Sequence, residues 1–252
     1  MVEWRYRLAA GLTAAALIVA GVGPVGATGH ASKSKPLIEL FTSQGCSSCP
    51  PADALLQKFA LRPDVVALTM PVDYWDYLGW KDTLAKPRNS ARQRAYARAR
   101  GDGQIYTPQV VVNGLKHVSG GDERAIEKTL RRTGETLKRR RVEISMQATD
   151  DTLTIEVGAA PAGLGKTSGT VWLALIKTVE KVHVLRGENR GRKLAYYNVV
   201  RELTPVGKWM GEAVTLKLPK HHLMQQGSDG CAVFLQQGRA GAILGAAELT
   251  RW

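Results

Sequence analysis

Two cysteines separated by two serines, Cys46 and Cys49, are the residues of this chain best suited to chemistry. An apolar run at residues 36–41 precedes them and a helical pattern at 52–61 follows, so we expect both on a strand-to-helix turn. Thiols at positions i and i+3 of such a turn can close a disulfide and reopen it by thiolate attack. The remaining cysteine, Cys231, begins an apolar strand, and we interpret it as a buried, inert thiol. The spacing therefore predicts redox chemistry at the first two cysteines.

The first 27 residues have the three parts of a secretory signal. Arg5 and Arg7 precede an apolar stretch at residues 8–22, and small residues follow as far as Ala27. A transmembrane anchor is the alternative, but glycines interrupt the stretch and a bilayer span needs about 20 apolar residues. Cleavage after Ala27 would leave 225 of the 252 residues, with a linker at 28–35 and no stable membrane span. We therefore expect a secreted or periplasmic protein, in a compartment where disulfides persist.

The formal net charge is +13, of which residues 1–27 contribute +1. An excess of this size is typical of proteins with anionic partners, such as lipid surfaces, acidic polysaccharide or acidic proteins. Export argues against nucleic acid, and no basic stretch is interleaved with the stacking aromatics that single-strand binders use. The charge thus predicts contact with an anionic surface through a basic face, or, as the alternative, only a solubilising surface.

The apolar pattern changes near Arg141 and divides the chain into two predicted domains. Residues 36–141 alternate strand-like and helix-like stretches, which indicates an α/β domain with a mixed sheet and flanking helices. Residues 142–252 contain short alternating runs separated by turns, which indicates a β-rich domain built as an antiparallel sandwich. Helices are predicted at 52–61, 89–100 and 122–138, and strands at 36–41, 65–70, 110–112, 142–146, 152–157, 171–176, 194–203, 213–218 and 231–236.

A second motif places Thr107-Pro108 before a β-branched run, 110–112, that ends in the Asn113-Gly114 turn. Proline cannot donate to a sheet ladder, so it belongs at the beginning of that strand. With the C-x-x-C, this motif resembles the thioredoxin/glutaredoxin superfamily and implies a thioredoxin-like fold for residues 36–141. The resemblance implies that the Thr107–Pro108 bond is cis, that it packs beside the cysteines and that its backbone pairs with a bound peptide or thiol.

The stretch 116–123 is similar to the part of glutaredoxins that holds the γ-glutamyl end of glutathione. The resemblance implies a glutathione contact at Gly120, Gly121 and Asp122, although this chain has about one extra residue there. The alternative is a turn in which the two glycines bend the chain and Asp122 caps the helix that follows.

Longer strings resemble a family of uncharacterised secreted bacterial proteins with a thioredoxin-like domain. The strings are residues 39–53, 72–82 and 106–114, and segments within 187–201 resemble the β-rich half of that family. Where members have histidine before the second string, this chain has Pro71, so no histidine role is transferred to it. The resemblance covers nearly the whole mature chain and implies the fold, but no established activity.

An aromatic and acidic string after the second predicted strand is a second candidate site, because α/β folds bind ligands at that end of the sheet. Its aromatic rings offer flat contact area, and its carboxylates could move protons or bind a substrate backbone. The alternative is a packed loop whose carboxylates cap a helix or pair with Arg92 or Arg94. The residues proposed for substrate binding here are Asp73, Tyr74, Trp75 and Asp76.

Two classes of function follow. In the first, the protein is a thiol–disulfide oxidoreductase in which exposed Cys46 exchanges with a protein or small-molecule thiol or disulfide, and Cys49 resolves the mixed disulfide. In the second, it is a non-catalytic binding protein for Cu(I), glutathione or a peptide, with a static disulfide or a metal-ligating pair. No cofactor is expected, and no metal site, because metal-ligand spacings are missing. Because proline disfavours the α region for the preceding residue, we expect the helix to begin only at Pro51 and its dipole to act weakly on Cys46.

Overall fold

The structure, a computed structural model, describes residues 29–31, 34–224 and 227–250. The expected signal segment, 1–27, lies outside the described residues. In chain order the elements are β1 (Gly29–Ala31), β2 (Leu37–Thr42), α1 (Pro50–Ala60), β3 (Val66–Pro71), the 3₁₀ helix η1 (Asp76–Leu78), α2 (Pro87–Arg100), β4 (Gln109–Val112), β5 (Lys116–Ser119), α3 (Glu123–Leu137), β6 (Ile144–Ala148), β7 (Thr152–Val157), β8 (Gly169–His183), β9 (Lys193–Trp209), β10 (Val214–Pro219), α4 (Lys220–Met224), β11 (Gly230–Gln236) and β12 (Ile243–Thr250).

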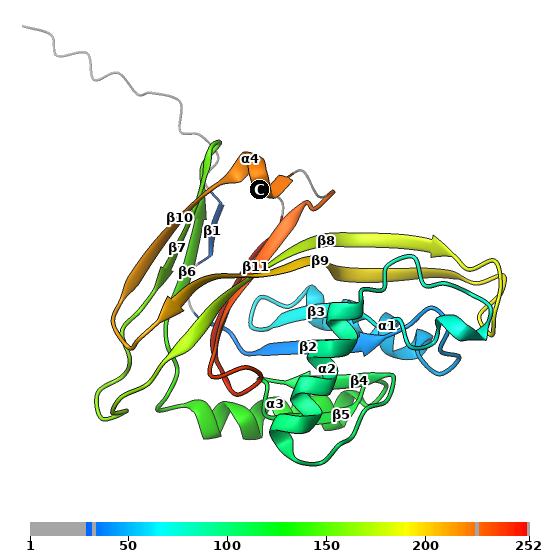
Figure 1. Ribbon diagram of the computed structural model, residues 1–252, viewed down its shortest axis with the longest axis horizontal. Helices are drawn as coiled ribbons and strands as arrows, with labels where there is room; N and C mark the ends of the chain where they lie inside the picture. The colour runs from blue at the N-terminus through cyan, green and yellow to red at the C-terminus, as the bar shows by residue number, and fades with distance from the viewer. Residues whose placement is uncertain (1–28, 32–33, 225–226, 251–252) are drawn as a thin grey trace, which may run out of the picture.

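One mixed sheet of eight strands, in the order β12-β11-β8-β9-β3-β2-β4-β5, runs through the molecule (Figure 1). Strand β2 is parallel to β3 and antiparallel to β4. A parallel pairing of Thr69 with Val199 joins β3 to β9. The sheet therefore takes strands from both sides of residue 141, where the sequence places a domain boundary.

Alternating residues of β2 determine which helix covers each face of the sheet. Ile38 and Leu40 pack in the core that includes side chains of α1 and α3. Leu37 and Phe41 point to the opposite face and pack with Tyr96 of α2. This alternation follows from the two-residue period of a strand, so a continuous apolar run becomes a strand buried on both faces.

A second sheet, in the order β1-β6-β7-β10, packs against the β12-β11-β8-β9 end of the large sheet and encloses a separate apolar core (Figure 1). Met146 and Ile155 come from the smaller sheet, and Leu173 and Val233 from the larger. Residues 29–31, which the sequence assigns to a linker, form β1 and pair with β6. The expected helices and strands are found with shifted ends, whereas η1, α4, β5, β12 and the full lengths of β8 and β9 were not predicted.

A buried ion pair connects α2 to the middle of the large sheet. The guanidinium of Arg92 donates to Glu39 of β2 at 2.6 Å and to Gln236 of β11 at 3.0 Å. The hydroxyl of Tyr96 also donates to Glu39. The Arg92 guanidinium lies 5.0 Å from the centroid of the Phe234 ring. A paired and hydrogen-bonded charge is tolerated in a core, so these contacts tie elements from both halves of the chain together.

The long hairpin of β8 and β9 extends past its neighbours toward the end of the sheet where α1 begins (Figure 1). Its tip, residues 184–192, is anchored by Val184 and Tyr196, which pack with Leu84 and Trp80 in a small buried cluster. This packing brings the hairpin tip to the turn between β2 and α1.

Candidate active site

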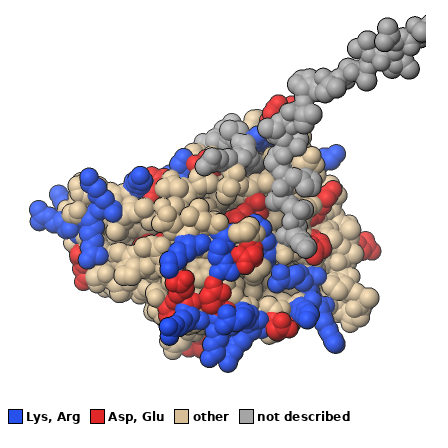
Figure 2. Space-filling view, turned by 180° about the vertical axis from the view of Figure 1, so that it is seen from behind, with Lys and Arg blue, Asp and Glu red and all other residues tan. Residues whose placement is uncertain are grey.

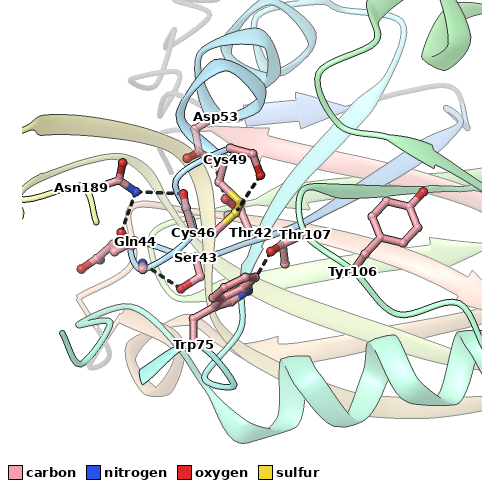
Figure 3. The surroundings of a disulfide bond; sticks show 12 residues. Thr42, Ser43, Gln44, Cys46, Cys49, Asp53, Trp75, Tyr106, Thr107 and Asn189 are labelled. Carbon is pink, nitrogen blue, oxygen red and sulfur yellow. Dashed lines mark hydrogen bonds between the residues drawn. A yellow bond between two sulfur atoms is a disulfide. The ribbon is translucent and has the colours of Figure 1, made fainter. Parts of the chain in front are cut away.

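Cys46 and Cys49 form a disulfide in the turn between β2 and α1, with their Cα atoms 5.4 Å apart (Figure 3). Two backbone hydrogen bonds shape the turn, from Cys46 N to Ser43 O at 3.1 Å and from Cys49 N to Cys46 O at 3.2 Å. The strand-to-helix placement inferred from the sequence is therefore observed.

The expected start of α1 at Pro51 is wrong. Cys49 has helical backbone angles, φ −80° and ψ −35°, and the helix begins at Pro50. Both prolines occupy the first turn of the helix, where a missing N–H removes no intrahelical hydrogen bond. This preference outweighs the tendency of a residue before proline to avoid helical backbone angles. The positive end of the helix dipole thus lies directly at the disulfide. The two prolines offer no N–H to it, and the next two N–H groups donate to the Cys49 carbonyl.

Both sulfur-bearing side chains are buried. Cys46 is 1% exposed and Cys49 is 0% exposed, whereas Ser47 and Ser48 between them are exposed. The expectation of an exposed Cys46 is therefore wrong for this oxidised state. Two segments far from the cysteines in sequence contact the same turn, around Trp75 and around Asn189.

Asn189, in the hairpin tip, is the contact that sequence reasoning missed. Its buried amide nitrogen donates to the backbone oxygens of Gln44, at 2.9 Å, and Cys46, at 2.8 Å (Figure 3). Buried carbonyl oxygens need a donor, so this side chain satisfies two backbone groups of the turn that carries Cys46 and Cys49, the C-x-x-C turn. The string from Gly187 to Gly191 carried the available sequence signal, because it belongs to the family resemblance.

Gln44 connects the C-x-x-C turn to the loop after β3. Its side-chain oxygen accepts from Trp80 Nε1 at 2.8 Å, and its backbone N–H donates to Asp82 at 2.7 Å. Asp82 also accepts from the backbone N–H groups of Leu84 and Ala85. Burial raises the pKa of Asp82 despite these bonds. Loop and turn are therefore held as one unit.

A buried carboxyl group lies one helical turn after Cys49. Asp53 Oδ1 accepts from the Thr42 hydroxyl at 2.7 Å, and Oδ2 has no hydrogen-bond partner among the described residues (Figure 3). Burial raises the pKa of Asp53 to about 8, and the negative charge of Asp82 adds to the effect. Residues four apart share a helix face, so Asp53 lies on the face of Cys49. With a pKa of about 8, its carboxyl group is mostly protonated at pH 7. Sequence reasoning did not select Asp53, although the string 39–53 ends on it.

The Thr107–Pro108 bond is cis, as the resemblance implied. The indole N–H of Trp75 donates to the Thr107 hydroxyl at 2.8 Å (Figure 3). Trp75 also packs on Gly45, since a Cβ added to this glycine would lie 3.1 Å from that of Trp75. Trp75 therefore joins the threonine–proline motif to the C-x-x-C turn, and these two motifs lie together.

The other members of the aromatic and acidic string have structural partners. Asp73 accepts from the Ser90 hydroxyl of α2, and Asp76 accepts from the backbone N–H of Asp82 at 3.0 Å. Tyr74 packs with Trp75 at 6.3 Å between ring centroids, and burial raises its pKa. The pairing of Arg92 with one of these carboxylates is not observed, because Arg92 binds Glu39.

The segment proposed for glutathione forms a tight turn and a helix cap. The carboxylate of Asp122 accepts from Ala125 N at 2.9 Å and so caps α3, which is the structural alternative. Gly120 N donates to Pro108 O at 2.9 Å, and a Cβ on Gly120 would meet Leu40, Pro108 and Ala52 within 3.1 Å. Gly121 is exposed, with open space around its Cα. Gly120 therefore lies where the loop that carries Pro108 packs against helix α1.

Three further observations concern the described part of the chain. Within it, no group of three or more His, Cys, Asp or Glu side chains could hold a metal ion. None of its helices is long and apolar enough to cross a bilayer. Cys231 is fully buried in an apolar core, and burial raises the pKa of its thiol, which confirms the interpretation of an inert cysteine.

Fold and site together define a mixed α/β protein with one large mixed sheet and few helices, in which a buried disulfide precedes the first long helix. The chain belongs to the family described as "Protein of unknown function (DUF1223)", whose sequence profile matches residues 37–236. Comparison with curated proteins finds no match.

Two solved structures are similar. The crystal structure of protein AGR_C_4864 from Agrobacterium tumefaciens has a TM-score of 0.76 and 38% identity, covering 86% of this chain and 94% of that one. HBP35 of Porphyromonas gingivalis has a TM-score of 0.61 and 15% identity, covering 87% of this chain and 76% of that one. At this lower identity the likeness concerns the fold alone.

Proposed function

We propose that this protein is an exported thiol–disulfide oxidoreductase that uses Cys46 and Cys49. The observation that carries the proposal is their disulfide at the start of α1, next to a buried, protonated carboxyl group at Asp53. A disulfide needs a proton source when it is reduced, because the sulfur that leaves does so as a thiolate. A purely structural disulfide has no use for one.

The arrangement around the pair supports a thioredoxin-like assignment for residues 36–141. Strand β2 leads through the C-x-x-C into α1, and the cis Thr107–Pro108 bond lies before β4, tied to the turn by Trp75. Helices α1 and α3 cover one face of these strands and α2 covers the other. The superfamily resemblance rests on these same two motifs, and redox exchange is its common chemistry.

The proposed exchange begins with a substrate thiolate that attacks the Cys46 sulfur. A bond forms between the two sulfurs, the Cys46–Cys49 bond breaks, and Cys49 leaves as a thiolate that takes the proton of Asp53. A second substrate thiolate then attacks the substrate sulfur of the mixed disulfide and releases Cys46. In total, the substrate dithiol loses two electrons and the Cys46–Cys49 disulfide gains them. In the reverse reaction, which reduces a substrate disulfide, the Asp53 carboxylate takes the proton of the Cys49 thiol before Cys49 attacks the mixed disulfide.

The site of action follows from the amino-terminal sequence. Residues 1–27 have the composition of a secretory signal, so we place the protein outside the cytoplasm, in the periplasm or medium. Oxidised and reduced forms of the pair both have a use there, since exported proteins form and reshuffle disulfides in that compartment.

The test has two parts. The folded protein is equilibrated in buffers with an increasing ratio of reduced to oxidised glutathione. Alkylation of free thiols followed by mass measurement then gives the fraction of protein in which the Cys46–Cys49 disulfide is reduced. A variant, Cys49→Ser, is then mixed with reduced and partly oxidised exported proteins. We expect reversible reduction and a trapped mixed disulfide on Cys46; a native pair that excess dithiothreitol cannot reduce overturns the proposal.

A second candidate is a non-catalytic binding protein with a static disulfide, and the burial of both cysteines favours it. Under this alternative the pair resists reduction until the protein unfolds, and Asp53→Asn changes no exchange rate. Tight Cu(I) binding by the reduced pair without any trapped mixed disulfide would assign the cysteines to metal binding instead.

A further inference from the structure

A groove of about 840 Å³ opens between the loop that follows η1 and the tip of the β8–β9 hairpin. Trp80, Lys81 and Lys86 line it from the loop, and Leu185 and Arg186 from the hairpin tip. Both walls belong to segments that already contact the C-x-x-C turn, so the groove is a candidate for the surface on which a substrate lies.

Gln44 connects the groove to the cysteine pair, because it contacts residues that line the groove and precedes Cys46 by two residues. Trp80 and Asp82, which line the groove, both hydrogen-bond Gln44, at 2.8 and 2.7 Å. Asn189 of the hairpin tip donates to the carbonyl oxygens of Gln44 and Cys46. A chain lying in the groove therefore contacts the two segments that hydrogen-bond Gln44, two residues before Cys46.

The exposed charges around the groove are mainly positive. Lys81 and Arg186 are exposed and Lys86 is half-buried. Along the hairpin tip, Arg190 and Arg192 are also exposed, and the acidic residue of the tip is Glu188, between Arg186 and Arg190. Figure 2 shows Lys and Arg gathered at the left end of that view, where the tip lies.

The acidic residue that lines the groove does not offset this charge. Asp82 is 4% exposed and its carboxylate accepts three backbone N–H bonds. Its carboxylate is therefore turned toward the backbone and is nearly inaccessible from the groove. A concave surface lined by one sign of charge attracts partners of the opposite sign and raises their rate of association.

We propose that this groove binds an acidic segment of the polypeptide whose cysteine exchanges with Cys46. The inference rests on the proposed redox function and names its substrate class: cysteine-containing polypeptides with Asp and Glu beside the cysteine. Leu185, 58% exposed at the groove, offers an apolar contact for a side chain of the same segment. Asn189 of the same hairpin tip hydrogen-bonds the backbone oxygen of Cys46, so a segment bound in the groove lies against the part of the chain that holds the turn.

The experiment compares how fast two peptides reduce the Cys46–Cys49 disulfide. The peptides have the same length and one cysteine each; glutamates flank the cysteine in the first and lysines flank it in the second. The proteins are wild type, the groove variant Lys81→Ser/Lys86→Ser/Arg186→Ser, and the control variant Arg124→Ser/Lys128→Ser/Arg131→Ser on α3. The control removes the same charge from exposed residues of another surface. Reduction by uncharged dithiothreitol is measured for all three proteins.

We expect the acidic peptide to react at least about tenfold faster than the basic one at low salt. We also expect the groove variant to lose this preference, the control to keep it, and dithiothreitol rates to stay within about twofold. Equal peptide rates, an equal loss in both variants, or binding to phosphatidylglycerol vesicles without a peptide preference overturns the proposed substrate class. A pair that neither peptides nor dithiothreitol reduce overturns the proposed function itself.

Discussion

The side-chain amide of Asn189 donates to the backbone oxygen of Cys46 at 2.8 Å, across a separation of 143 residues. One residue of the β-rich half thus holds the C-x-x-C turn of the α/β half. The tip that carries Asn189 is anchored through Val184 and Tyr196 in a buried cluster with Trp80. The hairpin of β8 and β9 is therefore part of the candidate site.

Replacement of Asn189 by alanine should uncover the disulfide. Two buried carbonyl oxygens lose their donor, so we expect the free energy of unfolding to fall by about 1–3 kcal/mol. We also expect dithiothreitol to reduce the folded variant several-fold faster than wild type, since the turn is freer to open. Denaturant titration and thiol quenching with mass measurement check both effects.

Asn89→Ala is the matched control for this substitution. Its buried amide donates to the Pro71 oxygen at 2.9 Å, so the variant loses the same kind of bond away from the disulfide. It should lose comparable stability without a change in reduction rate. Equal acceleration in both variants would mean that overall stability, and not the contact of Asn189 with the turn, controls how fast dithiothreitol reaches the disulfide.

Asp53→Asn should change how stability depends on pH. The folded-state pKa of Asp53 is about 8 against an ordinary value of 3.8, so between these pH values the unfolded chain releases a proton that the folded chain keeps. Wild-type stability therefore falls as pH rises through this window, by up to about 1.4 kcal/mol per pH unit. The variant lacks this loss, so its stability relative to wild type should increase from pH 4 to 8, measured by denaturant titration.

The same variant tests the role of Asp53 in exchange. Its amide oxygen can still accept from Thr42, but it has no proton to give Cys49. We expect slower reduction of the pair below pH 8, by about 10²-fold, and loss of the inflection near that pH. Burial also raises the pKa of Asp82 and of Tyr196, both of which interact electrostatically with Asp53, so a wild-type profile in the variant would assign the proton to one of them.

Two adjacent glycines should respond very differently to alanine. At Gly120 a Cβ would lie 2.8 Å from Leu40 and 3.0 Å from Pro108, so Gly120→Ala overpacks the junction and should cost about 1–3 kcal/mol. At Gly121 nothing lies within 4 Å, so Gly121→Ala should change stability by less than about 0.5 kcal/mol. Thermal unfolding followed by circular dichroism measures both; similar losses would contradict the packing at Gly120.

The buried pair of Arg92 and Glu39 should be costly to break from one side. Arg92→Met leaves the Glu39 carboxylate without its cation, and we expect a loss of about 3–5 kcal/mol in denaturant titration. Adding Glu39→Gln removes the stranded charge, so the double variant should regain part of the loss. Additive losses would show that the pair is not coupled.

Local signals explain what could be predicted from sequence. The C-x-x-C, the Thr107-Pro108 motif and the periods of α1, α2 and α3 each involve neighbouring residues, and the structure has these features close to the predicted positions. The start of α1 was misjudged because two local rules for proline compete: Pro50 disfavours a helical Cys49, yet proline is favoured in the first turn.

The sequence by itself determined the C-x-x-C motif, the three long helices and most of the strands, and the membership in the family, because these depend on residue type and short spacing. Only the tertiary structure decided that Cys46 is buried, that burial raises the pKa of Asp53 and that Asn189 contacts the turn of Cys46 and Cys49. Burial and long-range hydrogen bonds depend on which strands pair. The pairing of Thr69 with Val199, which joins the two halves into one sheet, is not encoded in any local pattern.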